Sequence, residues 1–252
     1  MKEWIAGRNP VYEALRASRR QFFRLWIAEG VEDSTRLSEI QALATQRRLP
    51  VERVPRPRLN ALGENPQGVA LEASHYPYAA LDDILVAARG RDNPLFVLVL
   101  DAIQNPQNLG SLLRTAEAVG VHGVVIPLAR AARVTPAVVS ASAGACEHLL
   151  IAQANLAQAL TELKEAGAWV VGLEALPEAL PPEKAPLDGP LALVVGSEGE
   201  GMRALVRRSC DFLVRLPMRG RVASLNAAVA GSIALYLAYR AREAAVTPPG
   251  SR

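Results

Sequence analysis

Short apolar runs separated by helical segments fill the chain from Leu95 onwards, and this pattern limits the possible folds more than any other feature. The runs show no alternation of polar and apolar residues, which would mark a strand with one face in water. They are typical instead of a parallel sheet that helices cover on both faces. The predicted strands are Leu95–Leu100, Gly123–Ile126, Trp169–Leu173, Leu191–Val195 and Phe212–Leu216. The predicted helices are Leu109–Val119, Pro136–Ala145, Leu156–Glu165, Met202–Arg208 and Leu225–Arg242.

The preceding residues predict a smaller α/β domain. Its expected helices are Pro10–Arg16 and Arg36–Arg48, and its expected strands are Phe22–Ala28, Val51–Val54 and Val69–Glu72. We therefore expect an N-terminal domain over residues 1–75 and a linker over 76–94 with a short helix at Leu81–Ala88. The larger α/β domain would cover 95–244, and 245–252 would form a flexible tail.

Composition excludes several classes of protein. With 252 residues, 50% of them hydrophobic and 21% charged, the chain can bury a large core and is not a disordered tail. Two cysteines, Cys146 and Cys210, are too few for a disulfide scaffold and predict reduced core thiols in a cytosolic protein. No run approaches the roughly 18 apolar residues of a membrane span. We expect a soluble, cytoplasmic protein.

The charge balance gives weak support for an RNA or phosphate ligand. The net charge is only +3, but residues 1–75 hold 12 of the 28 basic residues and 9 of the 25 acidic ones, so the excess lies in the N-terminal third. Only Lys2, Lys164 and Lys184 are lysines. Guanidinium groups bind phosphate in a bidentate manner. A GC-rich genome, which favours arginine codons, would explain the same bias.

The residues after each predicted strand are the most informative, because ligands of a covered parallel sheet bind at the carboxyl ends of its strands. The first such junction, from Asp101 to Gly120, contains Asn108, which we expect to cap the following helix, and Arg114, which we expect in the second turn of that helix. Taken alone, these two residues fit a simple helix cap and a surface cation.

Two further junctions also carry polar residues. The second is a glycine-rich turn from Gly196 to Gly201, which matches neither a P-loop nor a dinucleotide fingerprint. Glu198 within it would repel phosphate and suits a ligand with hydrogen-bond donors or a positive centre. In the third junction, Ser224 is expected to cap the last helix and Asn226 to lie in its first turn.

These side chains follow three different strands of one sheet, so they can converge on one pocket. The set consists of Asn108, Arg114, Glu198, Ser224 and Asn226. The three histidines, His75, His122 and His148, show no metal-binding spacing and are expected to be structural or exposed. The sequence therefore predicts one polar site without a metal.

The three junctions resemble motifs one, two and three of the SpoU (TrmH-type) branch of the SPOUT methyltransferases. Those enzymes transfer a methyl group from S-adenosylmethionine to a ribose 2′-hydroxyl of RNA. The segments Ile5–Leu15, Gln67–Val69 and Tyr78–Asp83 look like the ribosomal members with an L30e-like N-terminal RNA-binding domain. These members include the bacterial enzyme that methylates a guanosine of 23S rRNA. The chain departs from many relatives at Pro66 and at 227–228.

The resemblance implies a C-terminal parallel-sheet SPOUT domain with a deep trefoil knot and a small L30e-like N-terminal domain. It assigns S-adenosylmethionine binding to Gly196, Gly201, Leu216, Met218 and Leu225, and catalysis to Asn108, Arg114, Glu198, Ser224 and Asn226. Because a guanidinium is a poor base, Arg114 would mainly stabilise the developing alkoxide and the adjacent phosphate. The implied partners are RNA, above all 23S rRNA, and a second copy of the chain, with neither DNA nor a membrane.

Three alternatives are open. A tRNA guanosine methyltransferase would share the chemistry, although such relatives usually have no N-terminal domain of this kind. A non-catalytic RNA-binding protein on the same scaffold would be expected to have lost part of the polar set. A nucleotide-binding oxidoreductase would need a fingerprint after the first strand of the sheet, and Asp101–Gly110 does not supply one.

Overall fold

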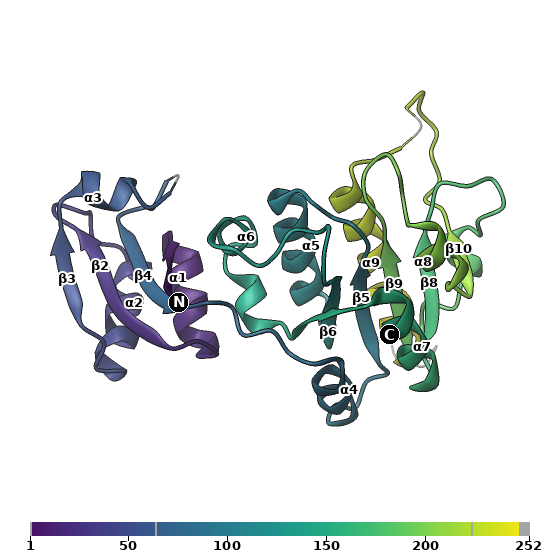
Figure 1. The fold of residues 1–252 in the computed structure, drawn as a ribbon, viewed down its shortest axis with the longest axis horizontal. Helices are drawn as coiled ribbons and strands as arrows, with labels where there is room; N and C mark the ends of the chain where they lie inside the picture. Colours follow the sequence, from purple (N-terminus) through teal and green to yellow (C-terminus); the bar gives the residue numbers. More distant parts are fainter. Residues whose placement is uncertain (1, 64, 223, 247–252) are drawn as a thin grey trace, which may run out of the picture. The chain divides into compact units, whose positions relative to one another are not determined.

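The computed structural model describes residues 2–63, 65–222 and 224–246 (Figure 1). They form two compact units. The first unit combines residues 1–77 with 133–148, and the second combines 78–132 with 149–252. Within the described residues, no helix has both the length and the apolar character that crossing a membrane requires.

The first unit contains a four-stranded sheet in the order β1-β4-β2-β3. β4 pairs antiparallel with β1 and β2, whereas β2 and β3 are parallel. Its N-terminal elements are β1 (Lys2–Ala6), α1 (Arg8–Ala17), β2 (Phe22–Ala28), α2 (Thr35–Gln46), β3 (Val51–Val54), α3 (Arg56–Asn60) and β4 (Val69–Ser74). Leu59 of α3 packs against Trp26 and Ala28 on one face of the sheet, while α1 contacts β1 and β4.

Residues 133–148 also belong to this unit, although they follow the start of the expected C-terminal domain in the sequence. They form α6 (Pro136–Ala141) and the short 3-10 helix η1 (Ala145–His148). The Arg20 side chain is fully buried and donates from Nε and Nη2 to both carboxylate oxygens of Glu147, at 2.9 and 2.6 Å. Burial lowers the pKa of Arg20, but Glu147 and Glu3 outweigh it and hold that pKa above its ordinary value. A buried ion pair thus joins two distant parts of the chain.

The second unit confirms the predicted parallel sheet, whose six strands follow the order β10-β8-β9-β5-β6-β7. Every pair of neighbours is parallel. Its strands are β5 (Phe96–Leu100), β6 (Gly123–Pro127), β7 (Ile151–Ala154), β8 (Trp169–Leu173), β9 (Leu191–Val195) and β10 (Phe212–Val214). Its helices are α4 (Leu81–Arg89), α5 (Pro106–Ala118), α7 (Leu156–Glu165), η2 (Pro182–Lys184), α8 (Ala204–Arg208) and α9 (Ala227–Val246).

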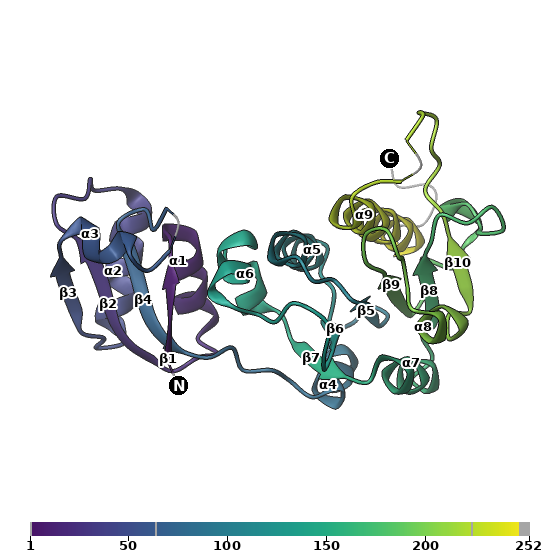
Figure 2. The same cartoon turned by 45° about the horizontal axis from the view of Figure 1, so that its top comes forward.

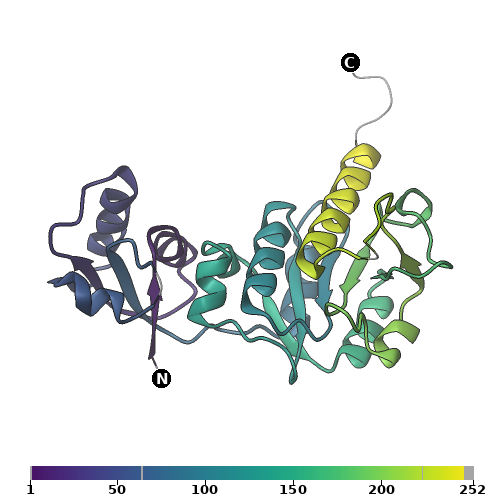
Figure 3. The same cartoon turned by 90° about the horizontal axis from the view of Figure 1, so that it is seen from above.

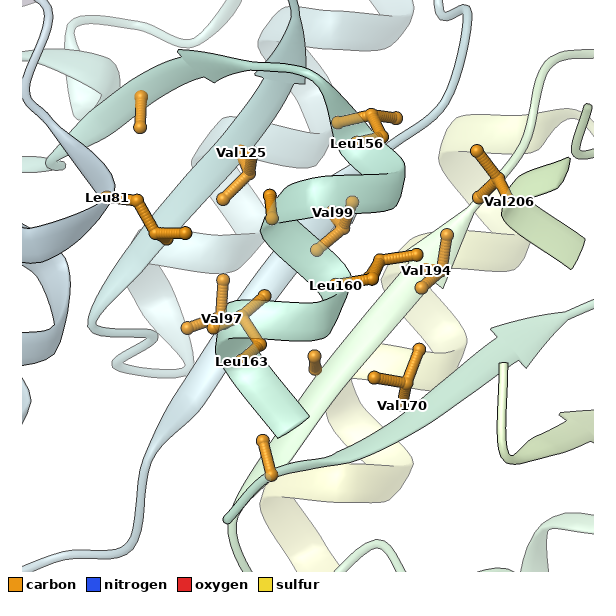
Figure 4. Close-up of a cluster of buried hydrophobic side chains, with 14 of the residues drawn as sticks. Leu81, Val97, Val99, Val125, Leu156, Leu160, Leu163, Val170, Val194 and Val206 are labelled. Carbon is orange, nitrogen blue, oxygen red and sulfur yellow. The ribbon is translucent and has the colours of Figure 1, made fainter. Parts of the chain in front are cut away.

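Helices cover both faces of this sheet, as the apolar strands require (Figure 2). α5 and α9 pack side by side on one face (Figure 3). A Cβ atom on Gly231 of α9 would lie 2.6 Å from Leu112 of α5, so the glycine permits this close approach. On the other face α4 and α7 bury an aliphatic core against β5, β6, β8 and β9 (Figure 4). Leu81 of α4 belongs to this core, although α4 falls within the linker expected at 76–94.

Several sequence predictions need correction. Three elements, β1, α3 and β7, were not expected. β10 ends at Val214 rather than at Leu216. α8 and α9 begin two residues later than predicted, at Ala204 and Ala227. The expected tail falls mostly on residues 247–252, which lie outside the described residues. The trefoil knot depends on how the chain threads, and it stays a prediction.

Candidate functional site

Asn105, not Asn108, is the N-cap of α5. Its side chain accepts a hydrogen bond of 2.8 Å from the backbone N–H of Gln107, and Pro106 takes the first helical position. Asn108 is therefore the third residue of the helix. Because Asn105 supplies the cap, the Asn108 side chain is available for contacts outside its own helix.

Glu198 joins the turn after β9 to the starts of α5 and α9. Its Oε1 atom accepts a hydrogen bond of 2.9 Å from Asn108 Nδ2 and another from Asn226 Nδ2. Asn226 Nδ2 also lies 3.2 Å from Asn108 Oδ1. We call Asn108, Glu198 and Asn226 the polar cluster. Three residues predicted from separate strand ends thus meet in one place.

The start of α9 reverses the roles expected for Ser224 and Asn226. Asn226 Oδ1 accepts hydrogen bonds from the backbone N–H groups of Ala228 and Val229, at 2.9 and 3.2 Å, so Asn226 caps the helix. Ser224 lies before the helix and is exposed. The Asn226 side chain uses its oxygen for its own helix and its nitrogen for the polar cluster.

A pocket of about 500 Å³ lies beside the polar cluster, and we call it the C-terminal pocket. All five residues expected to bind the cofactor line it, namely Gly196, Gly201, Leu216, Met218 and Leu225. Glu198, Ser224 and Asn226 line it as well. A Cβ atom on Gly196 would lie 2.3 Å from the backbone of Gly201, so only glycine allows the turn to fold this tightly.

The lining of the C-terminal pocket favours a ligand that combines apolar surface with positive charge. Two carboxylates, Glu174 and Glu198, reach it, and none of the described lining residues is Lys, Arg or His. Apolar walls come from Leu173, Val195 and Leu216. Such a lining repels phosphate and attracts cationic groups.

Arg114 does not line the C-terminal pocket. It is exposed, and no hydrogen bond or ion pair with another described residue holds it. Six residues at 3.6 per turn place Arg114 about 120° around α5 from Asn108. The Asn108 side of the helix faces α9, because Thr115 contacts Ser232 of α9 at 2.9 Å. Arg114 was expected in the second turn of its helix, but it is in the third.

Two carboxylates at this edge of the sheet were missed by the sequence reasoning. Asp101 is fully buried after β5 and accepts hydrogen bonds of 2.7 Å from both the backbone N and the Nε of Arg203. These two bonds anchor Arg203, which follows the turn that carries Glu198. Glu174 follows β8 and accepts from the backbone N–H of Met202. The rule that sites follow strands would have found both, had it been applied to β8 and to the first residue after β5.

The cysteines are free thiols, as predicted. Burial raises the pKa of both Cys146 and Cys210 to about 12, so both are protonated and unreactive near neutral pH. His75 and His148 contact Glu3 and Glu13, respectively, through single ring nitrogens. Across the described ranges, no group of three metal-binding side chains comes together.

Comparisons with known protein families cover most of the chain. The family model described as the SpoU rRNA methylase family matches residues 95–236. A second model, described as RNA 2′-O ribose methyltransferase substrate binding, matches residues 4–79. A TrmH-family tRNA/rRNA methyltransferase of Bacillus subtilis is 43% identical over 245 residues, which cover 95% of this chain and 96% of that protein.

Two solved structures resemble this chain to different extents. An AdoMet-bound rRNA methyltransferase from Sinorhizobium meliloti is 25% identical, with a TM-score of 0.76, and the match covers 95% of this chain and 87% of that chain. A TrmH/SpoU tRNA modifying enzyme of A. aeolicus is 28% identical, with a TM-score of 0.54. That match covers 82% of the A. aeolicus chain but only 65% of this one.

Proposed function

Because this chain belongs to the SpoU rRNA methylase family of RNA methyltransferases, we propose that it transfers a methyl group from S-adenosylmethionine to a ribose 2′-hydroxyl of RNA, at a guanosine of 23S rRNA. The observation that carries the proposal is the polar cluster beside the C-terminal pocket. Three polar side chains from separate strand ends hydrogen-bond to one another there. A structural role for each alone would not require them to meet.

The C-terminal pocket fits S-adenosylmethionine. This cofactor carries an apolar-faced adenine and a positively charged sulfonium, whose methyl group is the one transferred. Leu173, Val195 and Leu216 offer apolar walls for the ring, and Glu174 and Glu198 offer negative charge to the cationic part of the molecule. The tight turn at Gly196 lets a ligand approach the backbone closely.

Ribosomal RNA is favoured over tRNA as the substrate class. The A. aeolicus tRNA modifying enzyme matches only 65% of this chain, whereas the S. meliloti rRNA methyltransferase matches 95% of it. Residues 4–79 of this chain also match a family model described as RNA 2′-O ribose methyltransferase substrate binding. We therefore assign the choice of RNA to the first unit, which we call the N-terminal unit, and methyl transfer to the second, which we call the C-terminal unit.

The reaction needs orientation and charge stabilisation more than a strong base. A ribose oxygen forms a bond to the methyl carbon as the carbon–sulfur bond breaks in line, and the hydroxyl proton leaves to solvent. Glu198 holds Asn108 and Asn226 in place, and these amides orient the ribose. Ser224, which is exposed and lines the pocket, contacts the adjacent phosphate or ribose. The guanidinium of Arg114 stabilises the developing alkoxide and the phosphate.

Arg114 performs this role at the pocket of a second copy of the chain. It lies about 120° around α5 from Asn108 and does not reach the pocket of its own chain. α9, which packs beside α5, presents an apolar stripe to solvent, with Val229, Ile233 and Tyr236 exposed by 48, 40 and 50%. Their spacing places them on one face of the helix. A homodimer that covers this stripe would bring α5 of one chain towards the site of the other.

The test is methyl transfer to three unmodified RNAs offered separately, namely 23S rRNA, 16S rRNA and total tRNA. S-adenosylmethionine with a radiolabelled methyl group supplies the signal. We expect label in 23S rRNA alone. Because alkaline cleavage needs a free 2′-hydroxyl, the label should remain in alkali-resistant dinucleotides, and nuclease digestion should place it on guanosine.

Arg114→Ala and Arg207→Ala form a matched pair for this test. Both remove an exposed arginine of the same unit, but Arg207 lies on α8 outside the site. Arg114→Ala should lower the rate by about 100-fold, and Arg207→Ala should leave it unchanged. Label in tRNA alone would overturn the substrate but keep the chemistry. Cofactor binding without transfer to any of these RNAs would favour the non-catalytic alternative.

A further inference from the structure

A second pocket, distinct from the site of methyl transfer, lies entirely within the N-terminal unit. It measures about 830 Å³, within the range of ligand sites, and we call it the N-terminal pocket. Its walls come from the start of α1, the end of β2, α3 and the segment before β4. All its lining residues fall between Arg8 and Gly68, inside the region matched by the substrate-binding model.

Arg8 is held rigidly in the wall of this pocket. Its Nε donates to the backbone oxygen of Gln67 at 3.1 Å, and its Nη1 donates to Ser34 Oγ at 2.8 Å. A third bond runs from Nη2 to the backbone oxygen of Glu32 at 3.3 Å. The backbone N–H of Arg8 is capped by the Gln67 side chain at 3.0 Å. This network fixes the guanidinium before any ligand arrives, which lowers the entropic cost of binding.

The positive charge of the pocket is not neutralised by ion pairing. Arg56 donates to the backbone oxygen of Gly30 at 3.2 Å, and among the described residues neither Arg8 nor Arg56 forms an ion pair with a carboxylate. In the same unit Arg16, Arg20, Arg24 and Arg36 each pair with a glutamate. The two pocket arginines therefore retain charge for an anionic ligand, although Glu32 also lies at the wall.

The remaining lining suits a nucleobase. Val31 is partly exposed and provides apolar surface, and Ala28 and Leu59 also line the pocket as buried side chains. Asn60, at the end of α3, is exposed and lines the same pocket with an amide that can both donate and accept hydrogen bonds. Charge, apolar surface and an amide edge match the phosphate, the ring face and the ring edge of one nucleotide.

We propose that the N-terminal pocket binds an unpaired nucleotide of the substrate RNA and thereby selects the RNA. This inference rests on the proposed function, because it takes RNA as the substrate. Arg8 and Arg56 hold the phosphate, the apolar surface receives the base, and Asn60 distinguishes among bases. An unpaired nucleotide is required because bases within an RNA duplex are stacked and their edges are poorly accessible.

The experiment measures binding of fluorescein-labelled single-stranded oligoribonucleotides of about 12 nucleotides, a length within the usual site sizes of single-strand grooves. The four homopolymers and a duplex of equal length are titrated against the full chain by anisotropy at several salt concentrations. Arg56→Gln should weaken single-strand binding by about fivefold and lower the salt slope by about 0.7, as expected for one lost phosphate contact. The single strands should bind more tightly than the duplex.

Two further variants separate a specific pocket from general charge. Arg53→Gln removes an exposed arginine of β3 that does not line the pocket, so it should leave single-strand affinity within about twofold of wild type. Asn60→Ala should reduce the affinity differences among the four homopolymers without changing the salt slope. A melting temperature equal to that of the wild type confirms that the N-terminal unit of each variant is folded.

Equal weakening by Arg56→Gln and Arg53→Gln would overturn the proposal, because diffuse charge would then explain binding. Tighter binding of the duplex, or no binding of any single strand by the wild type, would overturn it as well. Methyl transfer is assayed separately. If the wild type methylates rRNA but Arg56→Gln binds single strands as tightly as the wild type, nucleotide binding by the N-terminal pocket is refuted and the proposed function stands. If Arg56→Gln binds single strands more weakly but the wild type transfers no methyl group, the proposed function is refuted and nucleotide binding by the N-terminal pocket stands.

Discussion

The two ends of the six-stranded parallel sheet both hold polar side chains, but the contacts of these side chains differ. At the carboxyl end, Asn108, Glu198 and Asn226 contact one another and adjoin a pocket. At the amino end, His122 and Arg242 contact neighbouring backbone groups. His122 accepts at Nδ1 from the N–H of Phe96 at 3.0 Å, and Arg242 donates to the backbone oxygens of Gly189 and Pro94.

The kind of hydrogen-bond partner distinguishes candidate functional side chains from structural ones better than burial does. His122 and Arg242 are exposed by only 3 and 9%, and their hydrogen-bond partners lie at or just before the starts of β5 and β9, namely Phe96, Asn93, Pro94 and Gly189. Glu198 is exposed, and its partners are side chains of two helices. We therefore expect changes at the carboxyl end to reduce activity and changes at the amino end to reduce stability.

The largest effect is expected for Glu198→Gln. The neutral amide is a weaker acceptor for Asn108 and Asn226 and removes a negative charge from the pocket, so kcat should fall by about 100-fold. The unfolding free energy should stay close to that of the wild type. Glu200→Gln is the matched control, because Glu200 is exposed in the same turn but does not line the pocket. Single-turnover methyl transfer and urea unfolding measure the two quantities. Equal rates for both variants would contradict the role of the cluster.

The second prediction concerns two inactive variants mixed together. If Arg114 serves the site of the partner chain, Arg114→Ala and Glu198→Gln should complement each other in a mixed dimer, where one of the two sites is intact. Random reassembly should then restore about a quarter of wild-type activity. If both residues served the same chain, the mixture would remain inactive. The measurement is methyl transfer after joint denaturation and refolding, with each variant refolded alone as the control.

The sequence predicted the parallel sheet better than it predicted the contacts among the candidate site residues. Apolar strands such as Leu191–Val195 are determined locally, because burial on both faces requires a continuous apolar run. The four-residue strand β7 and the charged start of β1 lack that signal. Asn105 and Asn108 lie three residues apart at the start of α5, and only the structure shows that Asn105 is the cap and leaves the Asn108 side chain available.

Other features depend on distant parts of the chain. The buried pair of Arg20 and Glu147 joins positions 127 residues apart, which no local pattern encodes. The direction of Arg114 depends on the rotation of α5 against α9, fixed by contacts such as Thr115 with Ser232. Sequence motifs indicate candidate residues for a site, but helix packing determines which of them reach the same pocket.

The third prediction tests the amino end through Arg242→Met. The substitution keeps apolar contact with the Phe96 ring, which lies 4.8 Å from the guanidinium carbon, but it leaves two backbone oxygens without their donor. Unfolding free energy should fall by about 2 kcal/mol. Arg207→Met, at an exposed arginine of α8, should change it by less than about 0.5 kcal/mol. The folded variant should keep the wild-type kcat, and a loss of kcat without a loss of stability would reverse the comparison.

The smallest effect is a pH dependence of stability at His122. Burial, helped by the positive charge of Arg91, lowers the pKa of His122 below its ordinary value of 6.5. Above pH 6.5 the ring is neutral in both states, and the bond from the Phe96 N–H to Nδ1 contributes fully. As the pH falls below 6.5, the unfolded chain binds a proton that the folded chain does not, so stability decreases by at most about 1.4 kcal/mol per pH unit.

His122→Gln removes this titration. Urea unfolding between about pH 7 and pH 5 should therefore give a shallower loss of stability than in the wild type, even though the variant is less stable at neutral pH. His75→Gln, at a half-exposed histidine of the other unit, should keep the wild-type slope in the unfolding of the C-terminal unit. Methyl transfer by folded His122→Gln should match the wild type near neutral pH, since the ring lies at the opposite end of the sheet from the polar cluster. An unchanged stability slope combined with altered transfer would place a functional group where the structure shows only a structural one.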